Sequence, residues 1–136
     1  MYFKFDPSLS IHVPAPFSRV MTPYMTSDTA TGPIDFSIHH TVLQPGAEVD
    51  EHFHESAIEV MFCVSGRGKC SLCGVEYDFV PDSMVAAMPG EKHWIKNDGN
   101  EDLVMLCIFD PPTSAEALKK RSEAAYQKYL EENGGK

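Results

Sequence analysis

Two histidines and a glutamate in the middle of the chain are spaced so that their side chains could bind a single metal ion. His52 and His54 are separated by one residue, and in an extended chain such residues project from the same face. Glu59 stands inside the apolar run 57–64, where an ionised carboxylate is costly unless it is paired or coordinates a metal. A shared cation therefore explains all three side chains.

A third histidine could reach the same point from another strand. His93 follows the turn signal Pro89-Gly90 and begins the segment His-Trp-Ile-Lys-Asn. Imidazoles with one carboxylate suit Fe, Mn, Ni, Co, Cu or Zn rather than Ca or Mg, which prefer oxygen ligands. The alternative, surface or core histidines without a metal, requires several independent coincidences. We therefore predict one divalent transition metal, bound by His52, His54, Glu59 and His93.

The residues around this cluster have the pattern of short strands. From Ile34 to Phe109, apolar or alternating runs are separated by turn signals, a spacing typical of an all-β sandwich or barrel. Because several runs are apolar on both faces, one face must pack inside the barrel and the other against a further sheet or another subunit. We therefore expect a homodimer. The expected strands are residues 35–43, 57–64, 68–73, 76–80, 83–88, 92–97 and 103–109.

The length of 136 residues suits a single domain. Residues 1–35 are rich in Pro, Ser and Thr and show no sustained period, which predicts an N-terminal arm with one short strand. Residues 36–110 form the predicted barrel. Residues 111–136 contain the predicted C-terminal α-helix.

This C-terminal segment has the boundaries of a helix. Thr113 and Glu116 have the spacing of a capping box, and Asn133-Gly134 is a favoured helix stop. The apolar stripe that includes Leu118 is narrow, so we expect the helix to dock on the barrel or on a partner subunit. It is predicted to be a packing element rather than a catalytic one.

Charge and hydropathy exclude several classes of partner. Eleven Lys and Arg against twenty Asp and Glu give a net charge of -9, which repels phosphate backbones. No segment approaches the roughly 20 apolar residues of a membrane-spanning helix. The N-terminal residues have no basic stretch leading into an apolar run. We expect no nucleic-acid partner, no membrane partner and a cytoplasmic location.

The four cysteines, at positions 63, 70, 73 and 107, are predicted to be free thiols. Cys70 and Cys73 have the spacing of half a zinc knuckle or of a redox pair. A structural zinc site needs two more ligands with their own spacing, and none is evident in the sequence. We therefore expect no second metal at this pair.

The segment with the first metal ligands resembles the first motif of the cupin superfamily. That motif reads Gly, five residues, His-x-His, four residues, Glu, six residues, Gly, and residues 46–66 follow it throughout. The resemblance covers residues 36–110. It implies a jelly-roll barrel in which the three histidines and Glu59 surround one metal, with one or two coordination positions open.

The second cupin motif is looser in this chain. Gly90, His93 and Asn97 are kept at the motif spacing. Pro89 adjoins Gly90 without the usual spacer, and Asp82 stands near the place of the first motif glycine. These departures affect the turn rather than the assignment of His93 as a ligand.

A narrower resemblance links the chain to the ectoine synthase family, cupins that cyclise a small acylated diamine with loss of water. Residues 36–46, the strand with Glu59, and residues 107–112 carry this resemblance. That family keeps the Glu and the last His, lacks the two histidines of the first motif, and has a tyrosine where this chain has Val85. After Pro112 the chain departs from the family pattern. The resemblance implies a relative in fold and pocket shape rather than the same enzyme.

Further residues are predicted to line a substrate pocket beside the metal. The ectoine synthase resemblance turns His39 and Thr41 inward, and a solvated strand edge is the alternative for both. Met61 and Cys63 share the parity of Glu59 and should lie on the same face of their strand. Aromatic residues such as Phe109 either close the pocket or belong to the core. The predicted pocket consists of His39, Thr41, Met61, Cys63, Val85 and Phe109.

These features predict a metalloenzyme acting on a small organic molecule, with the metal as Lewis acid or oxygen activator. Dioxygenase chemistry and redox-neutral lyase, isomerase or cyclase chemistry are both open, because the ligand set does not fix the reaction. The alternative from another class is a non-catalytic module that binds a metal or small ligand and acts as a sensor through a partner.

Overall fold

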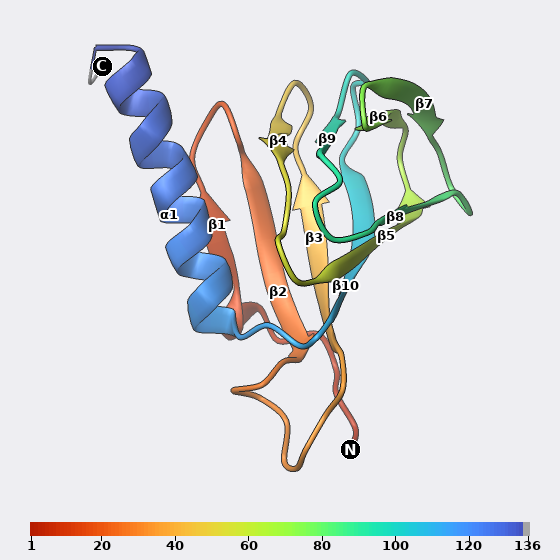
Figure 1. Cartoon of the computed structure of the whole chain (residues 1–136), viewed down its shortest axis with the longest axis vertical. Helices are drawn as coiled ribbons and strands as arrows, with labels where there is room; N and C mark the ends of the chain where they lie inside the picture. The colour runs from red at the N-terminus through yellow and green to blue at the C-terminus, as the bar shows by residue number, and fades with distance from the viewer. Residues whose placement is uncertain (135–136) are drawn as a thin grey trace.

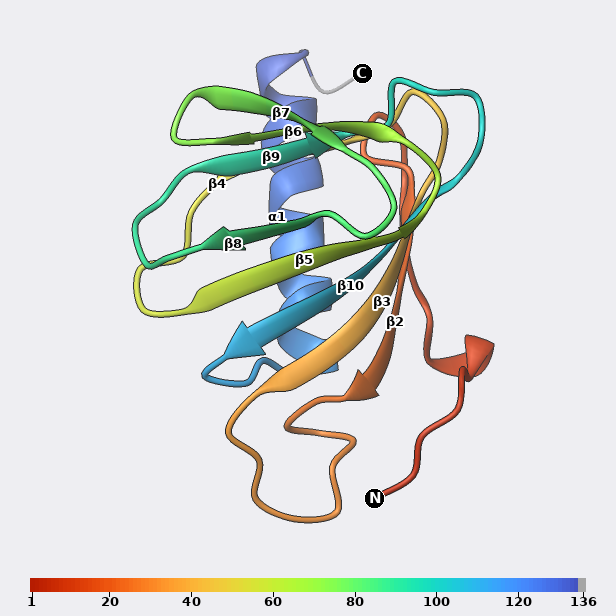
Figure 2. The same cartoon turned by 90° about the vertical axis from the view of Figure 1, so that its right-hand side faces the viewer.

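Two antiparallel sheets face each other in the computed structural model of the protein, which describes residues 1–134. The elements are a 3-10 turn (Pro7–Leu9), β1 (Ile11–Val13), β2 (Arg19–Met25), β3 (Ser37–Leu43), β4 (Glu48–His52), β5 (Ile58–Ser65), β6 (Gly68–Leu72), β7 (Val75–Phe79), β8 (Met84–Ala87), β9 (His93–Lys96), β10 (Leu103–Asp110) and α1 (Ala115–Glu132). The six-stranded sheet has the order β1-β2-β3-β10-β5-β8, and the four-stranded sheet has the order β4-β9-β6-β7. Figure 2 shows the larger sheet twisting from β8 and β5 through β10 to β3 and β2.

The all-β fold with a C-terminal helix is confirmed, and so is each strand predicted between residues 35 and 109. Alternation explains this success: every second residue of β3 and of β10 is buried on the face that meets the smaller sheet. The two sheets are not joined into a closed hydrogen-bonded ring, so the expected barrel is an open sandwich. Its core combines side chains from both sheets, including Leu43, Cys63, Phe79, Ile95 and Leu103.

The prediction of one short strand within residues 1–35 is wrong. β1 pairs with β2, and β2 pairs along β3 as a full member of the larger sheet. The inward face of β2 carries Arg19 and Pro23, which hide the apolar alternation of a half-buried strand. β4, which ends at His52, is likewise a strand that the sequence did not reveal.

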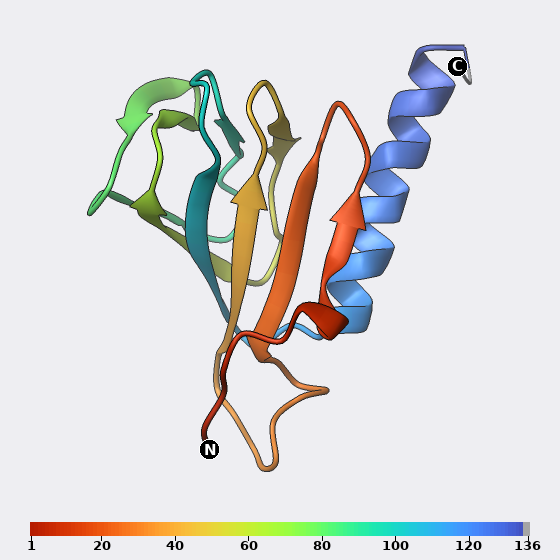
Figure 3. The ribbon, with the colours of Figure 1, turned by 180° about the vertical axis from the view of Figure 1, so that it is seen from behind.

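The C-terminal helix is confirmed as α1, which lies beside β1 at the side of the molecule away from β6 and β7 (Figures 1 and 3). Its N-cap is Ser114, whose hydroxyl accepts the Ala117 N–H at 3.0 Å. The prediction of Thr113 as the cap is wrong by one residue, because the Thr113 N–H and carbonyl bond to β3 and to the β2–β3 loop. The helix stops at Asn133 as predicted, and residues 135–136 of the predicted segment lie outside the described residues. Within residues 1–134, no helix combines the length and apolar character of a membrane span.

A residue far away in sequence caps the same helix. Asp28, in the β2–β3 loop, accepts hydrogen bonds from the N–H groups of Ala115 at 2.9 Å and Glu116 at 3.2 Å. One turn later, Leu118 packs with Val13 of β1 and neighbouring apolar residues. The capped end and this contact together attach α1 to the edge of the larger sheet.

Asn97, which the second cupin motif singled out, has a structural role. Its side chain is buried, and its amide donates to the carbonyls of Leu43 at 2.9 Å and Glu101 at 2.7 Å. Its own oxygen accepts the Gly99 N–H at 3.0 Å. Asn97 therefore ties together the β3–β4 and β9–β10 connections with all its polar atoms satisfied.

The four cysteines are free, as predicted. Cys70 is buried in the core, whereas Cys73 lies exposed in the β6–β7 turn with its thiol 3.4 Å from a carboxylate oxygen of Glu91. Within residues 1–134, neither joins a group of side chains arranged as metal ligands.

Replacing Asp28 should loosen α1 while leaving both sheets intact. In Asp28→Ala, two helix N–H groups lose their acceptor, and losses of a cap cost about 1 kcal/mol in other proteins. Thermal unfolding and hydrogen exchange of the Ala115 and Glu116 amides would measure the effect, with Asp35→Ala in the same loop as a control. Unchanged exchange of these amides in Asp28→Ala would contradict this role.

Candidate metal centre

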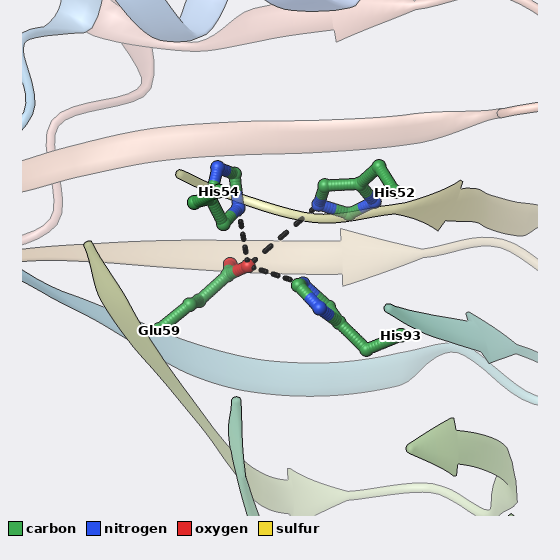
Figure 4. Close-up of side chains that lie close together, drawn as sticks. All are labelled: His52, His54, Glu59 and His93. Atoms are coloured by element: carbon green, nitrogen blue, oxygen red, sulfur yellow. Dashed lines mark hydrogen bonds and ion pairs between the residues drawn. The ribbon is translucent and has the colours of Figure 1, made fainter. Parts of the chain in front are cut away.

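Glu59 and the three histidines predicted as ligands meet at one point between the two sheets (Figure 4). His52 ends β4, His54 follows in the next loop, Glu59 lies in β5, and His93 begins β9. One possible ligand atom from each residue lies within 4.8 Å of all the others. The cluster therefore joins residues from both sheets.

All three imidazoles direct Nε2 at the same carboxylate oxygen. Oε1 of Glu59 lies 2.9 Å from Nε2 of His93, 3.1 Å from Nε2 of His54 and 3.7 Å from Nε2 of His52. Glu59 is 5% exposed and His93 is 1% exposed, whereas the other two rings are half-buried. A carboxylate charge thus lies in an almost dry interior with imidazole nitrogens around it.

Backbone carbonyls fix the protonation of two of these rings. Nδ1 of His52 lies 2.7 Å from the carbonyl oxygen of Asp50, and Nδ1 of His93 lies 2.9 Å from that of Glu91. Because a carbonyl oxygen can only accept, both rings carry a proton on Nδ1 and donate it. In the neutral ring, Nε2 then has a free lone pair, which faces the Glu59 oxygen. Hydrogen bonding of the far nitrogen to a carbonyl is typical of metal-bound histidines.

The cluster is electrostatically incomplete without positive charge. Burial raises the pKa of Glu59, but the interactions with the three imidazoles outweigh burial and hold the pKa of this carboxyl well below its ordinary value. Burial lowers the pKa of His93, yet its contacts with Glu59 and a backbone carbonyl together raise that pKa above the ordinary value. Protons and a metal cation therefore compete for the same nitrogens. The donor set, three imidazole nitrogens and one carboxylate oxygen, fits a divalent transition metal.

A cavity of about 270 Å³ adjoins the cluster. The inner faces of β2, β3, β5 and β10 form one wall, and residues of β4 and β9 form the opposite one. The helix α1 closes a side. Beyond the metal cluster, the lining includes Arg19, Met21, His39, Thr41, Val49, Asp50, Met61, Trp94, Ile95, Met105, Cys107, Arg121 and Lys128.

Three of the predicted pocket residues lie in this lining. His39 and Thr41 are only 2% and 3% exposed, so the alternative of a solvated strand edge is wrong for both. They share the inner face of β3 with buried Leu43. Met61 lies one inward position beyond Glu59 on β5. The polar side of β3 therefore faces the cavity.

The other three predicted pocket residues do not line the cavity. Cys63 and Val85 belong to the packed core, because Cys70 and Phe79 of the smaller sheet fill that part of the interior. Phe109 lies behind the lining, where its ring stacks on His39 with centroids 5.9 Å apart. Shared strand parity identifies the face of a side chain, but it does not give its depth along the sandwich.

His39 offers the cavity a neutral imidazole. Burial lowers the pKa of this residue to about 4, although the Glu59 carboxylate opposes the shift, so the ring is uncharged at neutral pH. Its Nδ1 is buried and has no hydrogen-bond partner within residues 1–134. A buried polar atom without a partner beside a cavity is suited to bind a ligand.

Sequence reasoning missed two arginines of the cavity. Arg19 lies in β2, the strand that was not predicted, and so received no face assignment. Arg121 lies on α1, whose cavity-facing side was interpreted as packing alone. A signal for Arg121 was present, since it is three residues from Leu118 and four from Ala125 and therefore borders the apolar stripe.

The sequence that forms most of the two sheets matches a known protein family. Residues 39–109, more than half of the chain, match the family described as the Cupin domain. The chain belongs to the cupin family. The jelly-roll fold expected from the two sequence motifs is thereby confirmed.

Curated and structural relatives agree with this assignment. L-ectoine synthase from Vibrio campbellii is 34% identical over 83 residues, which cover 60% of this chain and 64% of that enzyme. The chain thus spans less than two thirds of the curated relative that it matches. The crystal structure of ectoine synthase from P. lautus has a TM-score of 0.70 at 19% identity and covers 89% of this chain and 86% of its own.

A predicted oxalate decarboxylase from Thermotoga maritima also has a TM-score of 0.70, at 21% identity, covering 82% of this chain and 99% of its own. At such identities the structural likeness shows the fold alone. The sequence match supports the resemblance to the ectoine synthase family.

Removing the charge of Glu59 should weaken metal binding much more than folding. In Glu59→Gln, we expect metal affinity to fall at least about tenfold, because the charged ligand of the cation is lost. Thermal melts of wild type and variant, each with and without chelator, make the comparison. His93→Ala should behave likewise, and Glu55→Gln in the exposed adjoining loop is the matched control.

The same thermal melts would reveal a purely structural role of Glu59. If Glu59 were a purely structural residue, Glu59→Gln would lower the melting temperature equally with and without chelator. Equal losses in both conditions would exclude Glu59 as a metal ligand.

Proposed function

We propose that the protein is a metal-dependent enzyme that acts on a small organic molecule at the His52, His54, Glu59 and His93 centre. The observation that carries this proposal is the convergence of three Nε2 atoms on one oxygen of buried Glu59, beside a lined cavity. Four ligand atoms and an adjoining cavity are the two parts that a catalytic metal site requires.

The cavity residues suggest how a substrate would be handled. A divalent metal at this centre would act as a Lewis acid on a substrate oxygen or nitrogen. Neutral His39 can form a hydrogen bond with the bound molecule through Nδ1, which has no partner within residues 1–134. The hydroxyl of Thr41, on the same strand face, offers a further donor or acceptor. Closure of the side by α1 limits the access of water.

We propose redox-neutral chemistry of the lyase, isomerase or cyclase type rather than dioxygenation. The support is the sequence match to L-ectoine synthase over 83 residues, together with the family resemblance that residues 36–46, the strand with Glu59 and residues 107–112 carry. The match covers less than two thirds of that enzyme. This chain has His52 and His54 where the ectoine synthase family lacks the two histidines of the first motif, and this difference supports another substrate. A location in the cytoplasm and the absence of a nucleic-acid partner stay predictions from composition.

The reaction class can be tested with freshly purified protein. Metal analysis should find about one transition-metal ion per chain, as the single ligand cluster among residues 1–134 requires. A turnover screen of small organic molecules, run in air and under anaerobic conditions, should then give equal rates. Turnover that stops without dioxygen would instead establish an oxygenase, and binding without turnover of any compound would favour the sensor alternative.

We also propose that the chain forms a homodimer through the outer face of the larger sheet. This face presents half-buried apolar side chains, and a shallow apolar hollow there is lined by Met1, Phe3, Tyr24, Met25, Phe36, Ile38 and Leu106. Burying such a patch against a second copy would remove it from water.

Light scattering tests the dimer. The mass should be about twice the 15.1 kDa of one chain, and Leu106→Asp should shift it toward the monomer because a charge would enter the interface. Val75→Asp, on an exposed position of the smaller sheet, is the control. A monomer mass for wild type across a wide concentration range would exclude the dimer.

A further inference from the structure

Arg19 is a buried cation that has no ion-pair partner among residues 1–134. It is 8% exposed and lines the cavity. Its one hydrogen bond within this part of the chain is a long contact from Nη1 to the carbonyl of Phe17, at 3.5 Å. A guanidinium has five N–H donors in a planar fork, so most of its donors are left for a ligand. Burial of an unpaired charge is costly unless something in the functional state balances it.

Neither carboxylate of the cavity forms an ion pair with Arg19. Asp50 and Glu59 line the same cavity but are not within salt-bridge distance of the guanidinium. Burial lowers the pKa of Arg19; the carboxylates of Asp50 and Glu59 oppose this shift, and the guanidinium of Arg121 adds to it. Arg121 is close enough to repel Arg19. Two guanidinium groups facing one cavity would be stabilised by an anion between them.

Arg121 has only a weak partner of its own. Its Nη1 lies 3.4 Å from Nδ1 of His54, and its guanidinium lies over the ring of Phe109, 5.2 Å from the centroid. The contact with His54 uses one N–H of Arg121, and the guanidinium is exposed at the cavity, so its other donors are available to a ligand.

Positively charged side chains gather at the cavity although the chain as a whole is acidic. The net charge is -9, and the sequence contains three arginines, yet two of them line this one cavity. Lys128, one turn of helix beyond Ala124 on α1, adds a third cation to the lining. An acidic protein with cations gathered at its cavity attracts an anionic ligand to that point.

We propose that the substrate is a small organic anion whose carboxylate or phosphate group is bound by Arg19 and Arg121. The oxygen or nitrogen at the other end of the molecule would reach the metal centre, which lines the same cavity. The role of this anion as a substrate rests on the proposed function, whereas the presence of an anion-binding site does not. The bidentate fork of Arg19 selects a planar carboxylate or a phosphate over a neutral polar group.

Three ligand probes and the three arginines test the proposal. Acetate, inorganic phosphate and acetamide, the neutral isostere of acetate, are titrated into the metal-loaded and the metal-stripped protein and followed by NMR. We expect one or both anions to bind in both forms and acetamide to bind at least about tenfold more weakly. The tighter of the two anions identifies the chemical group that the substrate carries.

Substitutions assign the binding to the cavity. Arg19→Met should reduce anion affinity at least about tenfold, and Arg121→Met should reduce it severalfold, because each removes a charged donor. Arg67→Met, at the exposed β5–β6 turn, is the matched control and should leave affinity unchanged. If Arg19→Met does not fold, Arg19→Lys keeps the charge without the fork and should still bind the anion more weakly than wild type.

The outcomes separate this inference from the proposed function. Anion binding that is unchanged in both Arg19→Met and Arg121→Met would overturn the inference. Anion binding that is lost when the metal is removed by chelator and is unaffected by the arginine substitutions would also overturn it, because the anion would then bind only to the metal. The proposed function would still stand in that case. Arginine-dependent anion binding in a chain that takes up no metal would support the anion site and refute the metalloenzyme.

Discussion

The buried carboxylate of Glu59 and the three imidazole nitrogens directed at it impose the main constraint on this protein. Oε1 accepts contacts at 2.9 and 3.1 Å in an interior where an unbalanced charge is expensive. Glu59 comes from the larger sheet, whereas His52 and His93 come from the smaller one. The centre therefore forms only when the two sheets pack in the correct relation. Carbonyls of the neighbouring backbone then hold two rings in the tautomer that a metal needs.

The helix α1 connects the stability of the fold to the character of the cavity. Its first turn is held by Ser114 and by Asp28 from a distant loop, and Leu118 packs against the edge of the larger sheet. Four residues after Arg121, Ala125 also lines the cavity, so docking of this face positions the cation at the mouth. A helix cap and an apolar contact, which are structural features, thus decide which charged side chains of α1 line the cavity.

The sequence alone determined the features that depend on local pattern. The strands between residues 35 and 109 were predictable because short apolar or alternating runs, separated by turn residues, can be recognised in the sequence itself. The cluster of candidate ligands was predictable because extended geometry makes His52 and His54 neighbours and because a carboxylate in an apolar strand is costly without a partner. The C-terminal helix followed from its cap and stop signals, with an error of one residue at Ser114.

The tertiary structure decided what depends on distance along and across the sheets. β2 was not predicted because its inward-facing residues include the charged Arg19. A charged residue in a sequence is normally assigned to the solvent-exposed face, and only the structure shows that this one faces a cavity. For the same reason the parity of Cys63 placed it on the correct face but at the wrong depth, where Phe79 fills the space. Arg19 and Arg121 are far apart in the sequence and share the cavity because β2 and α1 both contribute side chains to its lining. Periodicity specifies the direction of each side chain from its own backbone, and only packing specifies which side chains meet.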